Sequence, residues 1–317
     1  MGTKISYKYS LGDWSRVEKD RFGFETENRS LTASNDIDVQ DEIYNWSEGA
    51  AYEKRITGKV ISNIVFYSEE MNETIGLSIY LPPDYNEDAN IKYPVIYVIG
   101  GNNAFTTTYE SPEYQEEWQF DEISEILIKS GKCRKFIIAA VNNIKNTNYF
   151  LVNRNKDLYS DIYFNLIISQ IKPFIDANYR SLIDKKNSLI FSAGIQAAAV
   201  LNSISEISRV FGNFVFLSPE ISIASEKITE RLNIISQDTG IPAKCWWESS
   251  ASGYFEKNST VKYINSAYDG RRISDILKKK NILDQKTIHY SEIDGDFHNV
   301  TAWSRRIDRI LLFFFKK

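Results

Sequence analysis

The stretch that decides the fold is Ser188-Leu189-Ile190-Phe191-Ser192-Ala193-Gly194-Ile195-Gln196, which Ala197-Ala198-Ala199 continue. Its apolar start predicts a short buried strand, and its small residues predict a helix that follows at once. A serine at such a turn is lifted clear of the sheet, and the amide of the next residue can face a developing oxyanion. We therefore predict that Ser192 is a nucleophile and that the Ala193 amide is an oxyanion donor. A serine that caps an ordinary helix gives the same local pattern, so residues elsewhere must decide.

On both sides of this stretch, predicted strands alternate with predicted helices. The strand at 93–99 is apolar throughout, which is typical of burial on both faces. The strands at 60–67 and 74–81 are expected to form an antiparallel pair. The alternation predicts the α/β class, with a mostly parallel central sheet and helices on both faces. The other predicted strands are 136–141, 188–191, 213–217, 261–265 and 287–293, and the predicted helices are 121–129, 159–177, 273–280 and 300–315.

A serine nucleophile needs a base, and the chain has two histidines downstream of Ser192. His289 lies inside a predicted strand with alternating polarity, which indicates a structural role. His298 follows Asp294-Gly295-Asp296-Phe297, in a loop between the last predicted strand and the last helix. The base of an α/β-hydrolase lies at this point of the chain, so we predict His298 as the base.

The base in turn needs an acid, which follows the nucleophile and precedes the histidine in α/β-hydrolases. Asp269 comes shortly after the predicted strand 261–265 and is our candidate. Asp294 and Asp296 remain alternatives, although aspartates at such positions more often form turns.

The second oxyanion donor is expected from Gly100-Gly101-Asn102-Asn103, which follows the apolar strand at 93–99. Backbone rich in glycine can turn tightly and approach a ligand. We expect the Asn102 and Gly101 amides to contribute to the oxyanion hole, and Asn103 and Trp303 to contact the substrate.

Five further stretches occur in the same order as motifs of a known family. They are Tyr80-Leu81-Pro82-Pro83-Asp84-Tyr85, Tyr97-Val98-Ile99-Gly100-Gly101-Asn102-Asn103-Ala104-Phe105, Glu117-Trp118-Gln119-Phe120-Asp121-Glu122, Lys172-Pro173-Phe174-Ile175-Asp176-Ala177-Asn178-Tyr179-Arg180 and His298-Asn299-Val300-Thr301-Ala302-Trp303-Ser304-Arg305. They resemble the esterase family of α/β-hydrolases that contains enterochelin esterases, feruloyl and acetyl-xylan esterases and the esterase D group. The resemblance runs from about residue 56 to the end. It implies an α/β-hydrolase domain at 57–317 and a serine esterase that acts through a Ser-His-Asp triad. The implied substrate is an acylated carbohydrate, a siderophore-type lactone or another small ester.

The chain departs from this family at the nucleophile motif, which reads G-x-S-x-G-G in the family. Ile190 stands at the first glycine and Ile195 at the last. Gly100 replaces the family's Asp before the oxyanion glycine, and Val300 replaces its Glu after His-Asn. We expect the branched side chains to alter the turn. Acyl transfer or cyclisation, and a catalytically degenerate binding protein, therefore remain alternatives to hydrolysis.

Residues 1–56 are expected to form a short β-rich segment. Tyr7-Lys8-Tyr9-Ser10-Leu11-Gly12-Asp13-Trp14-Ser15-Arg16-Val17-Glu18, with Asn28-Arg29, resembles the tail of a starch-binding-like module that often precedes such esterases. The segment is too short to bury its aromatic side chains alone. We expect it to lack a closed core and to pack on the hydrolase domain.

Composition excludes several function classes. The net charge of −4 and the absence of clustered Lys and Arg argue against a nucleic-acid partner. Two cysteines and two histidines argue against a disulfide framework and a multi-histidine metal centre, so we expect neither a metal nor a cofactor. No apolar run has membrane-spanning length and no signal sequence is visible, which predicts a cytoplasmic protein without a membrane partner unless a leader has been removed. The sequence leaves the oligomeric state open.

Overall fold

The computed structural model divides the chain into two units, Met1–Ile56 and Thr57–Lys317. It describes residues 3–19, 28–33, 38–39, 41, 43, 45–46, 57–105, 117–143, 158–221, 225–234, 243–250, 266–293 and 298–317. Each unit is described by itself below. No helix within these ranges is both long enough and apolar enough to cross a lipid bilayer.

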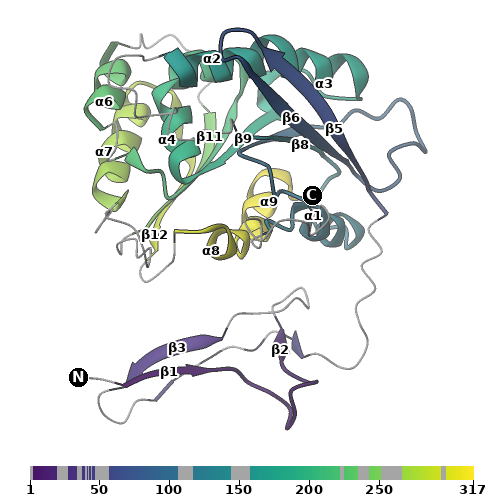
Figure 1. The fold of residues 1–317 in the computed structure, drawn as a ribbon, viewed down its shortest axis with the longest axis vertical. Coiled ribbons are helices and arrows are strands. Elements are labelled where there is room, and N and C mark those ends of the chain that lie inside the picture. Colours follow the sequence, from purple (N-terminus) through teal and green to yellow (C-terminus); the bar gives the residue numbers. More distant parts are fainter. Residues whose placement is uncertain are drawn as a thin grey trace. The chain divides into compact units, whose positions relative to one another are not determined.

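An eight-stranded sheet forms the centre of the large unit, in the order β12-β11-β10-β9-β7-β8-β6-β5 (Figure 1). β6 runs antiparallel to its two neighbours, and the other neighbouring pairs are parallel. The sheet is therefore mostly parallel, as the sequence predicts. Its strands are β5 (Lys59–Ser68), β6 (Glu73–Leu81), β7 (Val95–Ile99), β8 (Ile137–Val141), β9 (Ser188–Ala193), β10 (Asn213–Leu217), β11 (Ala243–Ser250) and β12 (Leu283–Ile293).

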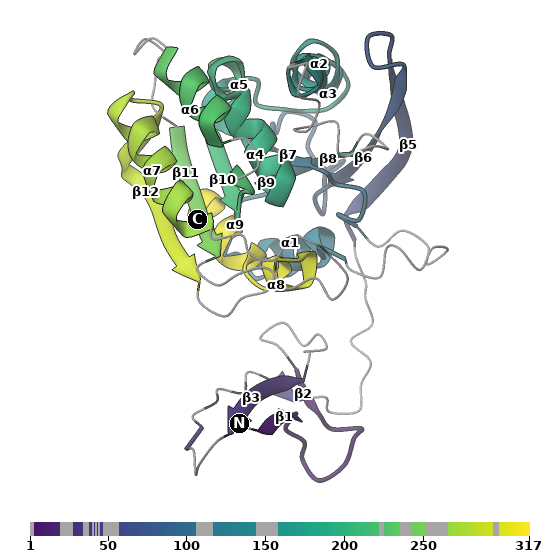
Figure 2. The same cartoon turned by 60° about the vertical axis from the view of Figure 1, so that its left-hand side comes forward.

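Helices cover both faces of this sheet, which confirms the predicted α/β-hydrolase layers (Figures 1 and 2). One layer holds α1 (Phe120–Lys129), α8 (Val300–Ser304) and α9 (Ile307–Phe315). The other holds α2 (Leu158–Leu166), the π-helical turn η3 (Ile167–Ile171), α3 (Lys172–Asn178), α4 (Gly194–Asn202), α5 (Ile204–Val210), α6 (Ser225–Ile234) and α7 (Ser266–Lys279). A short 3-10 turn, η4 (Lys185–Asn187), leads into β9.

The strands at the centre are buried on both faces because helices pack on each. β7, β8 and β9 are buried at every residue. Side chains alternate between the two faces of a strand. Ile190 thus belongs to the large apolar core, while Phe191 on the opposite face packs edge-on against Phe120 of α1. This packing on both sides fixes β9, the strand that leads into the site.

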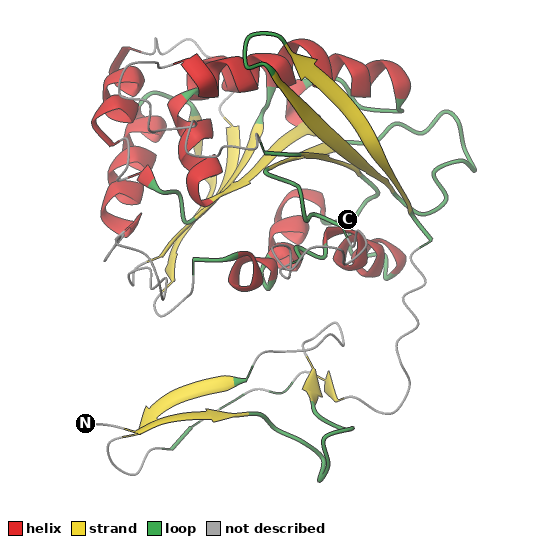
Figure 3. Ribbon diagram, viewed as in Figure 1, coloured by secondary structure: helices red, strands yellow, loops and turns green. Residues whose placement is uncertain are grey.

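Figure 3 distinguishes the helices, strands and loops by colour. Two predicted helices have a different form in the structure. The helix expected at 159–177 is continuous but contains η3 between α2 and α3. The helix expected at 300–315 is divided, because the chain turns at Arg305 and Arg306 between α8 and α9. β11 was not expected, since it mixes tryptophans with charged and hydroxyl side chains. The strand predicted at 261–265 lies outside the described residues.

The small unit is β-rich, as expected. β1 (Thr3–Tyr7) pairs antiparallel with β3 (Arg29–Ala33), and β2 (Glu18–Lys19) pairs antiparallel with β4 (Asn45–Trp46). Trp14 is 78% exposed, so this aromatic side chain does not contribute to a core.

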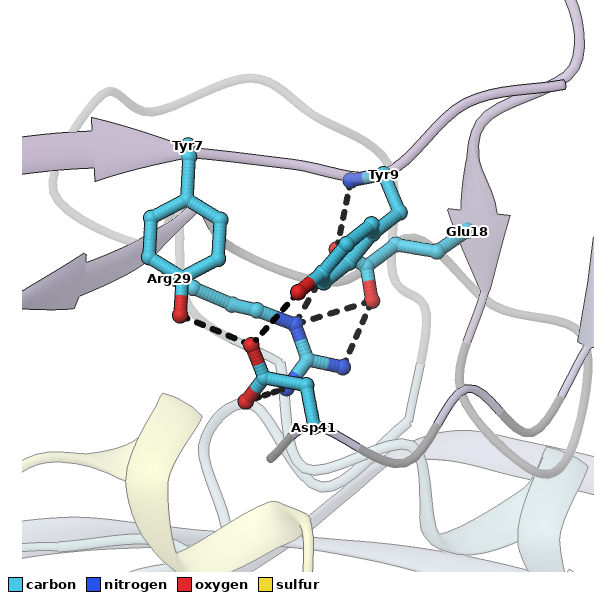
Figure 4. A network of polar contacts seen from close by, with 5 residues as sticks. All are labelled: Tyr7, Tyr9, Glu18, Arg29 and Asp41. Carbon is cyan, nitrogen blue, oxygen red and sulfur yellow. Dashed lines mark hydrogen bonds and ion pairs between the residues drawn. The ribbon is translucent and has the colours of Figure 1, made fainter. Parts of the chain in front are cut away.

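A polar network joins the strands of the small unit (Figure 4). The Arg29 guanidinium lies 2.7 Å from Glu18 Oε2 and 2.8 Å from Asp41 Oδ1. The hydroxyls of Tyr7 and Tyr9 both donate to Asp41 Oδ2, at 2.7 and 3.0 Å. Burial penalises the Glu18 carboxylate, but hydrogen bonds from Arg29 and from the Tyr9 amide hold the pKa of Glu18 below its ordinary value. One guanidinium thus satisfies two carboxylates that lie far apart in the sequence.

We predict that Arg29→Met destabilises the small unit by about 2 kcal/mol. Removing one partner of a buried ion pair costs about 3–5 kcal/mol, and the 27% exposure of the Arg29 side chain reduces this cost. The control is Arg16→Met, because Arg16 and Asp13 form an exposed pair. Hydrogen exchange of peptides from 3–19 measures the effect. Equal exchange rates in the two variants would contradict the role given to Arg29.

Candidate active site

The turn from β9 into α4 is made by Gly194. β9 continues through Ala193, and Gly194 has φ +53°, a left-handed conformation that favours glycine. In α/β-hydrolases the nucleophile occupies the strained strand-to-helix turn. The prediction that Ser192 lies at this turn is therefore wrong, because the residue in that place is Gly194.

A side chain on Gly194 would point into a cluster of functional groups. A Cβ added there would lie 3.1 Å from His298 Nε2, 3.3 Å from Glu220 Oε1 and 3.3 Å from Trp303 Cη2. These atoms are the surroundings expected for a nucleophile beside its base. Glycine supplies no hydroxyl at this point.

Ser192 lies two residues earlier, inside β9. It is fully buried, it pairs with Phe216 of β10, and its hydroxyl donates to the Val215 carbonyl at 2.9 Å. Ser192 thus takes the first small position of the G-x-S-x-G pattern, and the nucleophile position falls on Gly194. Ile190, which was aligned with the first glycine of the motif, lies in β9 and belongs to the core.

His298 lies between β12 and α8, the place that the sequence predicts for a base. The neighbouring Asn299 caps α8, since its side chain accepts a hydrogen bond from the Ala302 amide at 2.9 Å. The imidazole meets the Trp303 ring edge-on, with 4.8 Å between ring centroids. The His298 side chain is only 8% exposed. Its orientation is therefore held by both packing and the helix start.

Among the described residues, Glu220 is the acid that contacts His298, and it was not predicted from the sequence. Its Oε1 lies 2.9 Å from His298 Nε2. Glu220 follows β10, and its amide donates to the Gly194 carbonyl at 3.1 Å, which ties the two turns together. The signal was present in Ser218-Pro219-Glu220, directly after the predicted strand 213–217, because residues at the carboxyl ends of neighbouring parallel strands lie together.

Asp269, the predicted acid, lies in the first turn of α7, where Arg272 approaches its Oδ1 at 3.5 Å. The prediction that it leaves the end of a strand in a loop is wrong, because this part of the chain is helical. The alternatives Asp294 and Asp296 lie outside the described residues.

The loop after β7 has only part of the expected oxyanion function. The Gly101 amide donates to the Val141 carbonyl at 2.9 Å, so the prediction of Gly101 as an oxyanion donor is wrong. Asn102 is held through its side chain, which accepts from the Asn143 amide at 2.8 Å. Among the described residues, the Asn102 amide has no protein acceptor. It stays a candidate donor.

The turn lies two residues later than predicted, so the second candidate oxyanion donor also lies two residues later in the chain. Ala193 precedes Gly194, so the amide that follows the turn residue is that of Ile195, at the start of α4. Amides in the first turn of a helix have no partner within the helix. The loop lies beside this turn, since a Cβ on Gly100 would approach Gln196 Cγ at 3.1 Å. The amides of Ile195 and Asn102 are therefore the two candidate oxyanion donors.

Trp303 forms a wall of the site. Its ring stacks on Trp118, with centroids 5.9 Å apart and planes 15° apart, and it is 7% exposed. Asn103 is fixed through its carbonyl, which accepts from the Trp118 amide at 3.1 Å. Substrate contact by Asn103 and Trp303 stays a prediction.

Solved structures with this fold include several esterases. A ferulic acid esterase matches with a TM-score of 0.59 and 15% identity, over 81% of this chain and 98% of that one. A ferulic acid esterase from Anaeromyces mucronatus, in complex with ferulic acid, matches with a TM-score of 0.54 and 20% identity, over 84% and 92%. The feruloyl esterase module from Clostridium thermocellum, complexed with sinapinate, matches with a TM-score of 0.56 and 13% identity, over 82% and 89%. At these identities the matches show the fold.

A short stretch is also similar to curated proteins of another kind. Over 55 residues, 16% of this chain, it is 40% identical to an amylopullulanase of Thermoanaerobacter thermohydrosulfuricus. A similar stretch matches an amylopullulanase of Thermoanaerobacterium thermosulfurigenes at 40% identity over 52 residues. The matches span only 4% and 3% of the length of these relatives.

The family model described as "Putative esterase" matches residues 68–310, which is most of the large unit. This match agrees with the sheet order, with the place of His298 and with the esterases among the fold neighbours. The family match supports a hydrolase that acts on carboxylic esters. The chain therefore belongs to the esterase family of α/β-hydrolases that its motifs indicated.

Proposed function

We propose that this chain hydrolyses small carboxylic esters with a water molecule as the nucleophile, at the place where other members of this fold use a side chain. The observation that carries the proposal is Gly194, a residue without a side chain at the strand-to-helix turn, facing Glu220 and His298. A glycine here leaves room for water beside both groups.

Glu220 is the proton acceptor in this proposal. With Glu220 ionised, its 2.9 Å bond to His298 requires a proton on Nε2, so the imidazole donates and the carboxylate accepts. Nε2 is then no base, whereas the carboxylate has lone pairs left for a water. His298 orients Glu220 and offsets part of its charge.

The reaction then proceeds without an acyl-enzyme. Water gives one proton to Glu220 while its oxygen bonds to the ester carbonyl carbon. The amides of Ile195 and Asn102 face the oxyanion that forms. As this intermediate collapses, the bond to the alkoxide breaks and Glu220 returns the proton to the alkoxide oxygen. The products are a carboxylic acid and an alcohol.

Turnover by this route is expected to be slow. Hydrolases that lose a triad member retain about 10³–10⁴-fold acceleration over water from binding and oxyanion contacts. A positioned general base adds about 10²-fold or more. If the hydroxyl of a second substrate enters beside Gly194 in place of water, the same steps give acyl transfer or cyclisation.

A second candidate function is ester binding without turnover. It is favoured by the same glycine and by Glu220, which occupies the His298 nitrogen that a serine hydroxyl would use. For either function we propose an acylated carbohydrate or another small ester as the ligand. The feruloyl esterases among the fold neighbours and the stretch shared with amylopullulanases support this class.

We predict that Glu220→Gln lowers kcat/KM for p-nitrophenyl acetate and methyl ferulate by about 10²-fold, because the amide cannot accept the proton from water. The matched control is Ser192→Ala, which keeps turnover within about twofold and costs about 1 kcal/mol of stability through the lost bond to Val215. If Ser192→Ala lost turnover and Glu220→Gln kept it, Ser192 would be the nucleophile and this proposal would be wrong. Wild-type turnover no faster than that of Glu220→Gln would favour binding without catalysis.

We also predict that Gly194→Ser creates a site that reacts covalently with a fluorophosphonate, because its Cβ would lie 3.3 Å from Glu220 Oε1, the proposed proton acceptor, and 3.1 Å from His298 Nε2. The positive φ and this close contact make the variant about 1–3 kcal/mol less stable. Gly194→Ala carries the same strain without the hydroxyl and is expected to stay unlabelled, like the wild type. Mass spectrometry of the labelled peptide reads the result. Label on Ser192 of the wild type would contradict the assignment of the turn.

A further inference from the structure

Three carboxyl groups converge just before α1 and in its first turn, outside the hydrolytic site. They belong to Glu117, Asp121 and Glu122, and one oxygen from each lies within 4.8 Å of the other two. Asp121 and Glu122 are only 2% and 3% exposed. Figure 2 shows α1 in the helix layer that it shares with α8 and α9.

The buried Asp121 carboxyl needs a compensating partner or a proton. Asp121 Oδ1 is buried and has no hydrogen-bond partner among the described residues. The N-terminus of α1 offsets only about half an elementary charge. Buried carboxylates are normally paired, protonated or bound to a metal.

We propose that Glu117, Asp121 and Glu122 bind a divalent cation, and that the preferred cation is Ca²⁺. All three donors are carboxylate oxygens, which suit hard cations. Ca²⁺ takes about six to eight oxygen ligands in flexible geometry, whereas Mg²⁺ keeps several waters and usually binds only one or two carboxylates. A set of three carboxylates whose oxygens lie within 4.8 Å of one another therefore favours Ca²⁺.

The cation links α1 to the wall of the hydrolytic site. Trp118, next to Glu117, donates its amide to the Asn103 carbonyl at 3.1 Å and stacks on Trp303. Phe120, next to Asp121, donates its amide to the Ala104 carbonyl at 3.2 Å. Ca²⁺ between the three carboxylates thus fixes the segment that carries both backbone bonds. Its role is to position the loop and Trp303, and no step of hydrolysis passes through it.

Sequence reasoning expected no metal because it considered histidine and cysteine ligands. One of the motifs that indicate the family is Glu117-Trp118-Gln119-Phe120-Asp121-Glu122. None of its carboxylates has a role in the proposed hydrolysis. The structure shows that these carboxylates converge.

Calorimetric titration of the full chain, first treated with a chelator, tests the proposal with CaCl2 and MgCl2. We expect one Ca²⁺ per chain, a rise of Tm in millimolar CaCl2, and weaker binding of Mg²⁺. Asp121→Asn keeps the shape and removes one charge, so it should weaken Ca²⁺ binding at least tenfold. Glu87→Gln, on an exposed loop, removes the same charge elsewhere and should leave Ca²⁺ binding unchanged.

If Asp121→Asn does not fold, Glu117→Gln provides the same test at a less buried ligand. No heat of Ca²⁺ binding and no change of Tm would overturn the proposal. A variant Asp121→Asn that is more stable than a cation-insensitive wild type would also overturn it, because a shared proton would then explain the cluster. Mg²⁺ binding tighter than Ca²⁺ would overturn the choice of ion. These measurements involve no ester, so they stand apart from the proposed hydrolysis.

Discussion

The left-handed backbone of Gly194 is the constraint on which the rest of the site depends. β9 is held in the middle of the sheet by β7 and β10, so its end cannot shift. The chain must leave this end in one residue to begin α4, and a positive φ makes that possible. The same turn brings residue 194 to His298 and its carbonyl to the Glu220 amide. His298, Glu220 and the start of α4 are therefore brought together by one backbone conformation.

In the usual site of this fold, strain at the turn and the reactive hydroxyl belong to the same residue. Here Gly194 keeps the left-handed backbone of that turn but has no hydroxyl. Glycine adopts φ +53° at little cost, so the chain gains local stability where its relatives in fold carry strain. The carboxylate of Glu220 then approaches the imidazole from the side that a serine would occupy.

Most of the fold was predictable from local pattern. β5, β6, β8 and β10 come within one residue of the predicted bounds, because their apolar runs end at turn residues. The placement of the turn failed for a specific reason. Ser192 and Gly194 are both small, so the motif can be aligned in two frames two residues apart, and only the end of β9 decides between them. Since that end is set by pairing with β10, it is a property of the sheet and not of the local sequence.

Glu220 and Asp269 illustrate the same limit. The strand order β9-β10-β11 places the loop after β10 beside the loop after β9, and that order is invisible in the linear sequence. The conventional order of nucleophile, acid and histidine, with a strand predicted at 261–265, led to Asp269, which lies in the first turn of α7. His298 was found because its signal is local: a loop between the last strand and the last helices.

The π-helical turn η3 has a consequence for insertions and deletions. Tyr163, Ile167, Ile171 and Ile175 are fully buried and recur every four residues. In an α-helix of 3.6 residues per turn, side chains at that spacing drift by about 40° at each step and leave the core within a few turns. The wider turn at 167–171 winds back part of this drift and keeps all four in one line against the sheet. Losing a single residue here would rotate α3 by about 100°. Point changes on the outer face of this helix are therefore tolerated, whereas deletion of a single codon would expose Ile175 to water.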